Sequence, residues 1–232
     1  MGPFSAIKEK INTKIKKYIL NILYSEYQNI NIELQKRALA ETADYIEEKM
    51  NDVNSLSSRS EILIYAASKC ASTGLHLEFG VYSGQTINLI SKTFNSEVIY
   101  GFDSFQGLPE DWRDGFPSGM FKMNIEPKVN KNVQLVKGLF NETLPKFIEA
   151  NPGNIAFMHI DCDLYSSTKI IFDLLQNKII KGTVIVFDEY FNYPGWKMGE
   201  FKAFQEFVDK NNIRYSYLTY NNAHEQVAVI IE

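Results

Sequence analysis

The feature that most constrains the fold of this sequence is the alternation, after Gly74, of short apolar runs with helical stretches. Alternation of this kind favours parallel strands joined by right-handed helical crossovers. The sequence therefore predicts an α/β domain built on a mostly parallel sheet. Strands are predicted near 75–79, 98–102, 133–136, 155–160 and 183–187, with helices near 85–94, 142–150 and 166–179.

The last part of the chain departs from this alternation. A helix is predicted near 199–211, followed by strands at 213–219 and 226–231 with only a short polar turn at Asn221 and Asn222 between them. A parallel return needs a dozen or more residues, so these two strands are expected to form an antiparallel hairpin. The sheet is therefore predicted to be mixed but mostly parallel.

The first part of the chain is predicted to be helical, with further helices near 32–50 and 58–72; Ser58 and Glu61 have capping-box spacing. A basic amphipathic helix can lie on an anionic membrane. We favour packing on the domain or on a second subunit, which predicts a homodimer. Apolar and basic residues alternate at helical spacing in the first helix: Ile7, Ile11, Ile15, Ile19 and Ile22, with Lys8, Lys10, Lys14, Lys16 and Lys17 between them.

Charge and hydropathy exclude several classes of protein. The formal net charge of −4 provides no positive field for nucleic acid. The apolar runs are far shorter than the roughly 20 residues that span a bilayer, and no secretory signal is expected. Two cysteines in unrelated contexts fit a reducing compartment, which predicts a cytoplasmic protein.

A glycine-containing turn follows the first predicted strand, which ends at Glu78. Gly80 and Gly84 would let the backbone approach a ligand at a helix N-terminus, although Tyr82 stands where a dinucleotide-binding turn has its middle glycine. A carboxylate at Glu78 would suit a cationic ligand such as S-adenosylmethionine and would repel a pyrophosphate. The alternative is an ordinary tight connection between strand and helix.

Two further positions at strand ends are candidates for donor binding. Asp103 ends the second strand, where an acid commonly binds ribose hydroxyls, or it caps the turn that begins at Ser104. The segment from Gly138 to Phe140 follows the third strand and would lie along an adenine ring, unless its apolar residues belong to the core.

Acidic residues follow both the fourth and the fifth predicted strands. Asp161 and Asp163 come after the fourth strand, and Asp188 and Glu189 come after the fifth. The carboxyl ends of neighbouring parallel strands converge, and gathered carboxylates repel one another unless a cation or protons neutralise them. Oxygen ligands favour Mg²⁺, with Mn²⁺ or Ca²⁺ as alternatives. The other interpretation has these acids capping the helices that follow.

The long segment 104–131 is rich in glycine, proline and aromatic residues and is predicted to be a lid or an acceptor-binding loop. Trp112 and Trp196 are candidates for the walls of an acceptor pocket. His159 is expected to be a buried, hydrogen-bonded residue, and the acids beside Cys162 make it a poor nucleophile. Other aromatic candidates for stacking on a sugar are Phe116, Phe121, Tyr190, Phe191 and Tyr193.

The segments LEFGVYSG, GFDSFQGLPEDW, HIDCDLYSST and FDEY resemble the macrocin O-methyltransferase (TylF-like) family of class I methyltransferases over roughly residues 60–232. The resemblance implies a seven-stranded Rossmann-like fold, binding of S-adenosylmethionine, Mg²⁺ dependence and methylation of a sugar hydroxyl. We expect residues 58–232 to form the donor-binding domain and residues 1–57, which the resemblance does not cover, to form a helical extension, a lid or dimer contact. Glu189, where members usually have Asp, and Cys162, where they usually have Gly, depart from the family pattern. The implied metal ligands are Asp161, Asp188 and Glu189, and the implied donor-binding residues are Glu78, Gly80, Ser83 and Asp103. Further candidates for donor binding, beyond what the resemblance implies, are Tyr82, Ser104, Gly138, Phe140 and Asp161.

The expected reaction is in-line methyl transfer, with the acceptor proton taken by Asp163 or Asp161. A metal-dependent glycosyltransferase is an alternative, because an apolar strand followed by Asp161-x-Asp163 also occurs in that class. A non-catalytic protein that binds S-adenosylmethionine is a second alternative.

Overall fold

The computed structural model describes residues 3–71 and 73–232, apart from the side chains of residues 3–10, Leu23 and Glu26. Its helices are α1 (Pro3–Tyr27), α2 (Ile30–Lys49), α3 (Arg59–Lys69), α4 (Gln85–Thr93), α5 (Phe140–Ala150), α6 (Tyr165–Leu175) and α7 (Glu200–Asn211). Its strands are β1 (Ser55–Leu56), β2 (Leu75–Phe79), β3 (Ile99–Asp103), β4 (Val133–Lys137), β5 (Ile155–Ile160), β6 (Ile179–Phe187), β7 (Tyr215–Asn221) and β8 (Val227–Ile231).

The described strands form one sheet in the order β1-β7-β8-β6-β5-β2-β3-β4, in which β8 is antiparallel to both of its neighbours. The predicted Rossmann-like fold with a C-terminal antiparallel hairpin is confirmed. The sheet has one strand more than the expected seven, because Ser55 and Leu56 pair with the far end of β7. A strand of two residues is too short to produce a periodic pattern.

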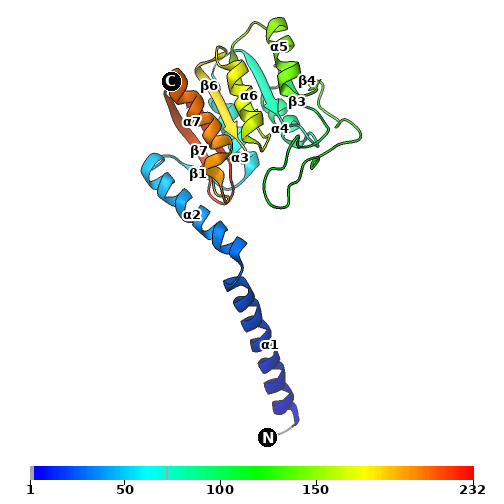
Figure 1. The fold of residues 1–232 in the computed structure, drawn as a ribbon, viewed down its shortest axis with the longest axis vertical. Helices are drawn as coiled ribbons and strands as arrows, with labels where there is room; N and C mark the ends of the chain where they lie inside the picture. The colour runs from blue at the N-terminus through cyan, green and yellow to red at the C-terminus, as the bar shows by residue number, and fades with distance from the viewer. Residues whose placement is uncertain (1–2, 72) are drawn as a thin grey trace.

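Helices cover both faces of the sheet, as Figure 1 shows. One face packs against α3 and α4 through a core that includes Ile62, Ile87 and Val186. The other face packs against α5, α6 and α7 through a core that includes Phe172 and Phe204. The sheet is thus buried on both sides, which explains the nearly continuous apolar character of its central strands.

The helix predicted to start after Ser58 begins there, because the Ser58 hydroxyl accepts the backbone N–H of Glu61. It ends at Lys69, earlier than the predicted residue 72, which lies outside the described residues.

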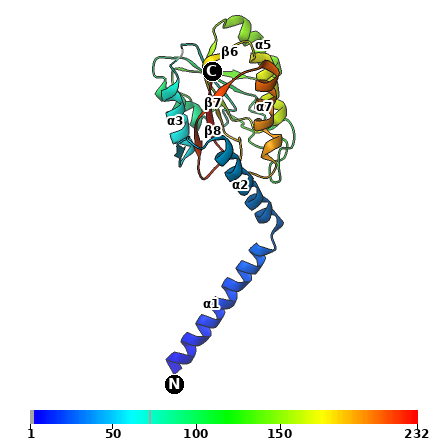
Figure 2. The same cartoon turned by 90° about the vertical axis from the view of Figure 1, so that its left-hand side faces the viewer.

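The two N-terminal helices differ in how they contact the domain. In α2, the Thr42 hydroxyl accepts the backbone N–H of Asn192 at 3.0 Å, and the ring of Tyr45 packs edge-on against Trp196. In contrast, α1 extends away from the domain in both views (Figures 1 and 2). Of the two expected alternatives, packing on its own domain is therefore not seen for this helix, and packing on a second subunit stays a prediction. The side chains of Ile7, Lys8 and Lys10 lie outside the described residues, and none of the described helices is long and apolar enough to cross a membrane.

Candidate active site

The register of the three central strands determines which side chains meet at their carboxyl ends. Glu78 of β2 pairs with His159 of β5, and His159 pairs with Val186 of β6. Since residues two apart in a strand share a face, His159 and Asp161 point to the side covered by α3 and α4, as does Asp188, two residues after Val186. The register thus brings acids from two neighbouring strands together.

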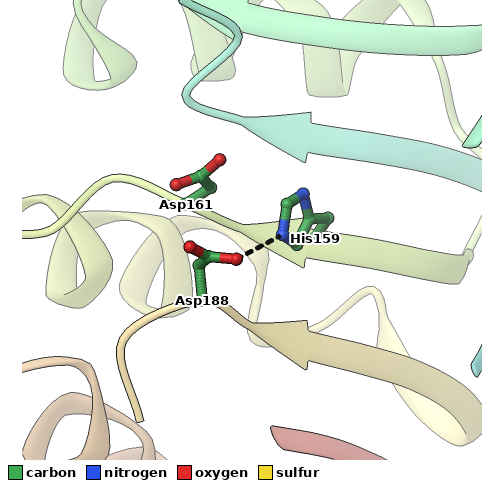
Figure 3. Close-up of side chains that lie close together, drawn as sticks. All are labelled: His159, Asp161 and Asp188. Carbon is green, nitrogen blue, oxygen red and sulfur yellow. Dashed lines mark ion pairs between the residues drawn. The ribbon is translucent and has the colours of Figure 1, made fainter. Parts of the chain in front are cut away.

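Ligand atoms of His159, Asp161 and Asp188 lie within 4.8 Å of one another, as Figure 3 shows. Arg59, the first residue of α3, also reaches this cluster. Its Nε lies 2.6 Å from Oδ1 of Asp188, and its terminal nitrogen pairs with Asp161. The two carboxylates therefore share one guanidinium.

Burial and mutual repulsion shift the pKa values of these acids. Burial, together with the negative charge of Asp188, raises the pKa of Asp161 to about 8. The same two causes raise the pKa of Asp163, a residue in the left-handed conformation (φ +65°), to about 7. Burial also opposes ionisation of Asp188, but the nearby His159 ring and the charge of Arg59 outweigh it and lower its pKa. The centre has more carboxylates than cations to neutralise them.

His159 is fully buried and hydrogen-bonded, as predicted. Its Nδ1 lies 3.3 Å from Oε2 of Glu78, and its Nε2 lies 3.8 Å from Oδ1 of Asp188. Burial favours the neutral ring, but the nearby carboxylates of Asp188 and Glu78 outweigh it and raise the pKa of His159 to about 10. Glu78 is itself buried, and its other oxygen accepts the Thr86 hydroxyl at 2.9 Å.

Glu189 follows Asp188 directly and belongs to a different set of contacts. Its backbone N–H donates to one oxygen of Glu200 at 3.3 Å, and the N–H of Cys162 donates to the other at 3.4 Å. Glu200 is fully buried at the start of α7 and so ties together the loops after β5 and β6. Glu200 could not be singled out from the sequence, because an acid in the first turn of a helix is common for reasons of helix polarity alone. Oε2 of Glu189 is buried and has no hydrogen-bond partner.

The predicted glycine turn approaches the loop after β5 very closely. Gly80 has φ +92°, and a Cβ atom on it would lie 1.7 Å from the backbone oxygen of Asp161. Asp103 holds the turn from the other side, since one of its oxygens accepts the N–H groups of Val81 and Tyr82 at 2.9 and 2.8 Å. The second oxygen of Asp103 accepts the N–H of Phe105 at 2.7 Å.

A cavity of about 660 Å³ joins the turn, the acids and the long segment after β3. Glu78 is the one predicted donor-binding residue that does not line it, because the side chain is directed into the protein toward His159 and Thr86. The predicted site residues that line the cavity are Gly80, Tyr82, Ser83, Asp103, Ser104, Gly138, Phe140, Asp161, Asp163, Asp188 and Glu189.

The segment 104–131 lies over this cavity, and Trp112, Phe116 and Phe121 line it. Arg113 stacks on the ring of Trp112 at 3.9 Å and forms two hydrogen bonds of 3.2 and 3.3 Å with Glu225. Trp196 does not line the cavity, because it is buried against Tyr45 of α2. Tyr190, Phe191 and Tyr193 are likewise buried.

Comparison with known proteins agrees with this geometry. A family described as "Methyltransferase domain" matches residues 77–190, the stretch from β2 to the residues just after β6. The match joins the glycine turn to the acids after β5 and β6, so the chain resembles this methyltransferase family over the part that holds the candidate site. The resemblance to the TylF-like members is confirmed as well. Demethyldecarbamoylnovobiocin O-methyltransferase of Streptomyces niveus is 27% identical in an alignment that covers 58% of this chain and 60% of that relative. The present chain thus spans less than two thirds of the length of that curated relative.

Solved structures show the same fold. The calicheamicin methyltransferase CalS11 superimposes with a TM-score of 0.61 at 20% identity, over 88% of this chain and 93% of that one. The O-methyltransferase NovP superimposes with a TM-score of 0.58 at 21% identity, over 74% of this chain and 78% of that one.

Proposed function

We propose that this methyltransferase transfers a methyl group from S-adenosylmethionine to a hydroxyl of a small, sugar-bearing acceptor, with the help of a divalent cation. The observation that carries the proposal is the juxtaposition, in one cavity, of the glycine turn at Gly80 with the carboxylates of Asp161 and Asp188. The curated relative is an O-methyltransferase, and CalS11 is described as a TDP-rhamnose 3'-O-methyltransferase.

The donor site is assigned to the part of the cavity between Gly80 and Phe140. Backbone N–H groups at the start of α4 and the left-handed turn at Gly84 suit the aminoacyl tail of the donor. Asp103 stands where an acid binds ribose hydroxyls in folds of this kind. Tyr82, Ser83, Ser104 and Gly138 border the same region.

The donor set at the acidic centre fits a hard divalent cation. Asp161 and Asp188 offer carboxylate oxygens within one cluster, and the buried Oε2 of Glu189 lacks a partner. Oxygen ligands of this kind suit Mg²⁺, Mn²⁺ or Ca²⁺. When bound, such an ion would lower the pKa of the acceptor hydroxyl and orient it for attack.

Asp163 is proposed to take the proton from the acceptor hydroxyl. It lines the cavity, its left-handed backbone directs it away from the strand, and its raised pKa of about 7 matches a base that works near neutral pH. Asp161 is the alternative base. We assign it to the cation instead, because it pairs with Arg59 and lies in one cluster with Asp188.

The acceptor is assigned to the space beneath segment 104–131. Trp112, Phe116 and Phe121 offer aromatic faces on which an apolar sugar face can stack. The Arg113–Glu225 pair fastens this segment to the loop between β7 and β8.

An assay with methyl-labelled S-adenosylmethionine tests the proposal. Nucleoside-diphosphate sugars and glycosylated phenols serve as acceptors, with Mg²⁺ or with EDTA. Labelled product that forms with Mg²⁺ and disappears with EDTA is expected. Bound donor without turnover on any acceptor would favour the non-catalytic alternative. Stabilisation by nucleoside-diphosphate sugars without any effect of the donor would favour a glycosyltransferase, which the family match at 77–190 does not support.

Replacing Asp103 by alanine is expected to weaken donor binding by roughly ten- to a hundredfold, because it removes a charged acceptor from two backbone N–H groups of the turn. Isothermal titration with S-adenosylhomocysteine measures this change. The control is Asp209→Asn, an exposed position on α7. Unchanged donor affinity in Asp103→Ala would remove Asp103 from the donor site.

A cytoplasmic location stays a prediction.

Residues 1–57 are proposed to form a dimer contact. The described part of α1 exposes a row of apolar side chains that includes Ile11, Ile15 and Ile22. Such a row is stabilised when a second copy covers it.

Light scattering of the full chain is expected to give twice the mass of 26.7 kDa. Ile15→Glu combined with Ile22→Glu should yield the monomer. Leu20→Glu, an exposed position on roughly the opposite side of the helix, should leave the dimer intact. A monomeric wild-type protein would contradict the dimer.

A further inference from the structure

Arg59 occupies an unusual position for a cation. It is the first residue of α3, where the free N–H groups give the helix a partial positive charge that disfavours a neighbouring guanidinium. The cost must be offset by a favourable contact elsewhere. Asp161 and Asp188 provide that contact, since Arg59 pairs with both.

The two partners of Arg59 are the same two acids that are assigned to the divalent cation. Nε of Arg59 lies 2.6 Å from Oδ1 of Asp188, an oxygen of the three-residue cluster with His159 and Asp161. A metal–oxygen bond of about 2.0–2.6 Å needs the same oxygen lone pairs. A dication and a guanidinium in the same small space would also repel each other strongly.

Arg59 is nevertheless able to leave. Its side chain is 38% exposed and lines the cavity, whereas that of Asp188 is only 8% exposed. The loops that carry the two acids are tied together behind them by Glu200, which accepts the backbone N–H groups of Cys162 and Glu189, so the positions of the acids do not depend on Arg59 alone. The guanidinium is thus the movable partner in a fixed acidic centre.

We propose that Arg59 and a divalent cation compete for the carboxylates of Asp161 and Asp188, so that Arg59 is the countercharge of this centre until the ion displaces it. The inference rests on the proposed function, because it takes the acidic centre to be the cation site. Arg59 is a positioning residue in this scheme: it keeps the two acids together in the empty protein and lowers the apparent affinity for the ion.

Mn²⁺ binding measured by electron paramagnetic resonance, which counts free ions and needs no turnover, tests this competition. Arg59→Gln is expected to bind Mn²⁺ roughly tenfold more tightly than the wild type, since the competitor is gone. Arg113→Gln is the matched control: it removes the other described arginine that lines the cavity, which pairs with Glu225 instead, and should bind Mn²⁺ like the wild type. If Arg59→Gln does not fold, Arg59→Lys gives the test, because one ammonium cannot bridge both acids as two guanidinium nitrogens do. It should tighten Mn²⁺ binding by a smaller factor.

The outcomes separate this inference from the proposed function. Mn²⁺ binding by the wild type with equal or weaker binding by the Arg59 variants would overturn the competition and leave the cation site standing. Binding by Arg59→Gln but not by the wild type would support the competition in its strongest form. If neither protein binds Mn²⁺, the proposed cation dependence fails, and the competition fails with it.

Discussion

Replacing Asp163 by asparagine is expected to lower kcat/KM for methyl transfer by roughly 10²–10⁴-fold, the usual contribution of a general base. Asparagine has nearly the same shape but accepts no proton at neutral pH. Since Asp163 lies beside the cation site and is not assigned to the donor, titration with S-adenosylhomocysteine should show unchanged donor affinity. A variant that keeps wild-type kcat/KM would exclude Asp163 as the base.

The pH dependence of the wild type provides an independent check on the same residue. With its pKa raised to about 7, Asp163 is protonated at low pH and becomes a competent base as the pH rises through that value. The value of kcat/KM should therefore increase with pH and level off above about 7. The rise of kcat/KM with pH should be absent in Asp163→Asn. A rate that falls as the pH rises through this range would contradict the assignment.

The second large effect is expected from Asp188→Asn. This change removes the charge of a buried carboxylate in the acidic cluster and is expected to weaken divalent-ion binding by about a hundredfold or more. Methyl transfer by the variant with Mg²⁺ should fall to the level of the wild type in EDTA, and EDTA should cause no further loss in the variant. Additive losses from the mutation and from EDTA would show that Asp188 acts independently of the ion.

Much of the fold could be predicted because its elements have simple periodic signatures. The strands at 75–79 and 155–160 were predicted with their observed bounds, since buried parallel strands read as short, continuous apolar runs. The strand β6 begins earlier than predicted, at Ile179, because Lys181 and Gly182 interrupt its apolar run. Helix α1 was predicted from its periodicity, but periodicity could not tell that it leaves its own domain.

Only part of the candidate site could be predicted from the sequence. That acids after β5 and β6 converge follows from the rule that carboxyl ends of parallel strands meet, and the structure brings Asp161 and Asp188 together. Arg59 and Glu225 were missed, because their partners Asp161 and Arg113 lie far away in the sequence. Glu200 was missed because it binds backbone N–H groups, which no motif reveals.

The most direct test of the account is whether a cation at the acidic centre lies beside the donor. Mn²⁺ broadens the nuclear magnetic resonance signals of nearby ligand protons, so the spectrum of bound S-adenosylhomocysteine reports their separation. We predict strong broadening in the wild type, greatest for the methylene protons next to sulfur, and its loss in Asp188→Asn. Mn²⁺ that binds with unit stoichiometry yet leaves these signals sharp would place the ion elsewhere and contradict the account.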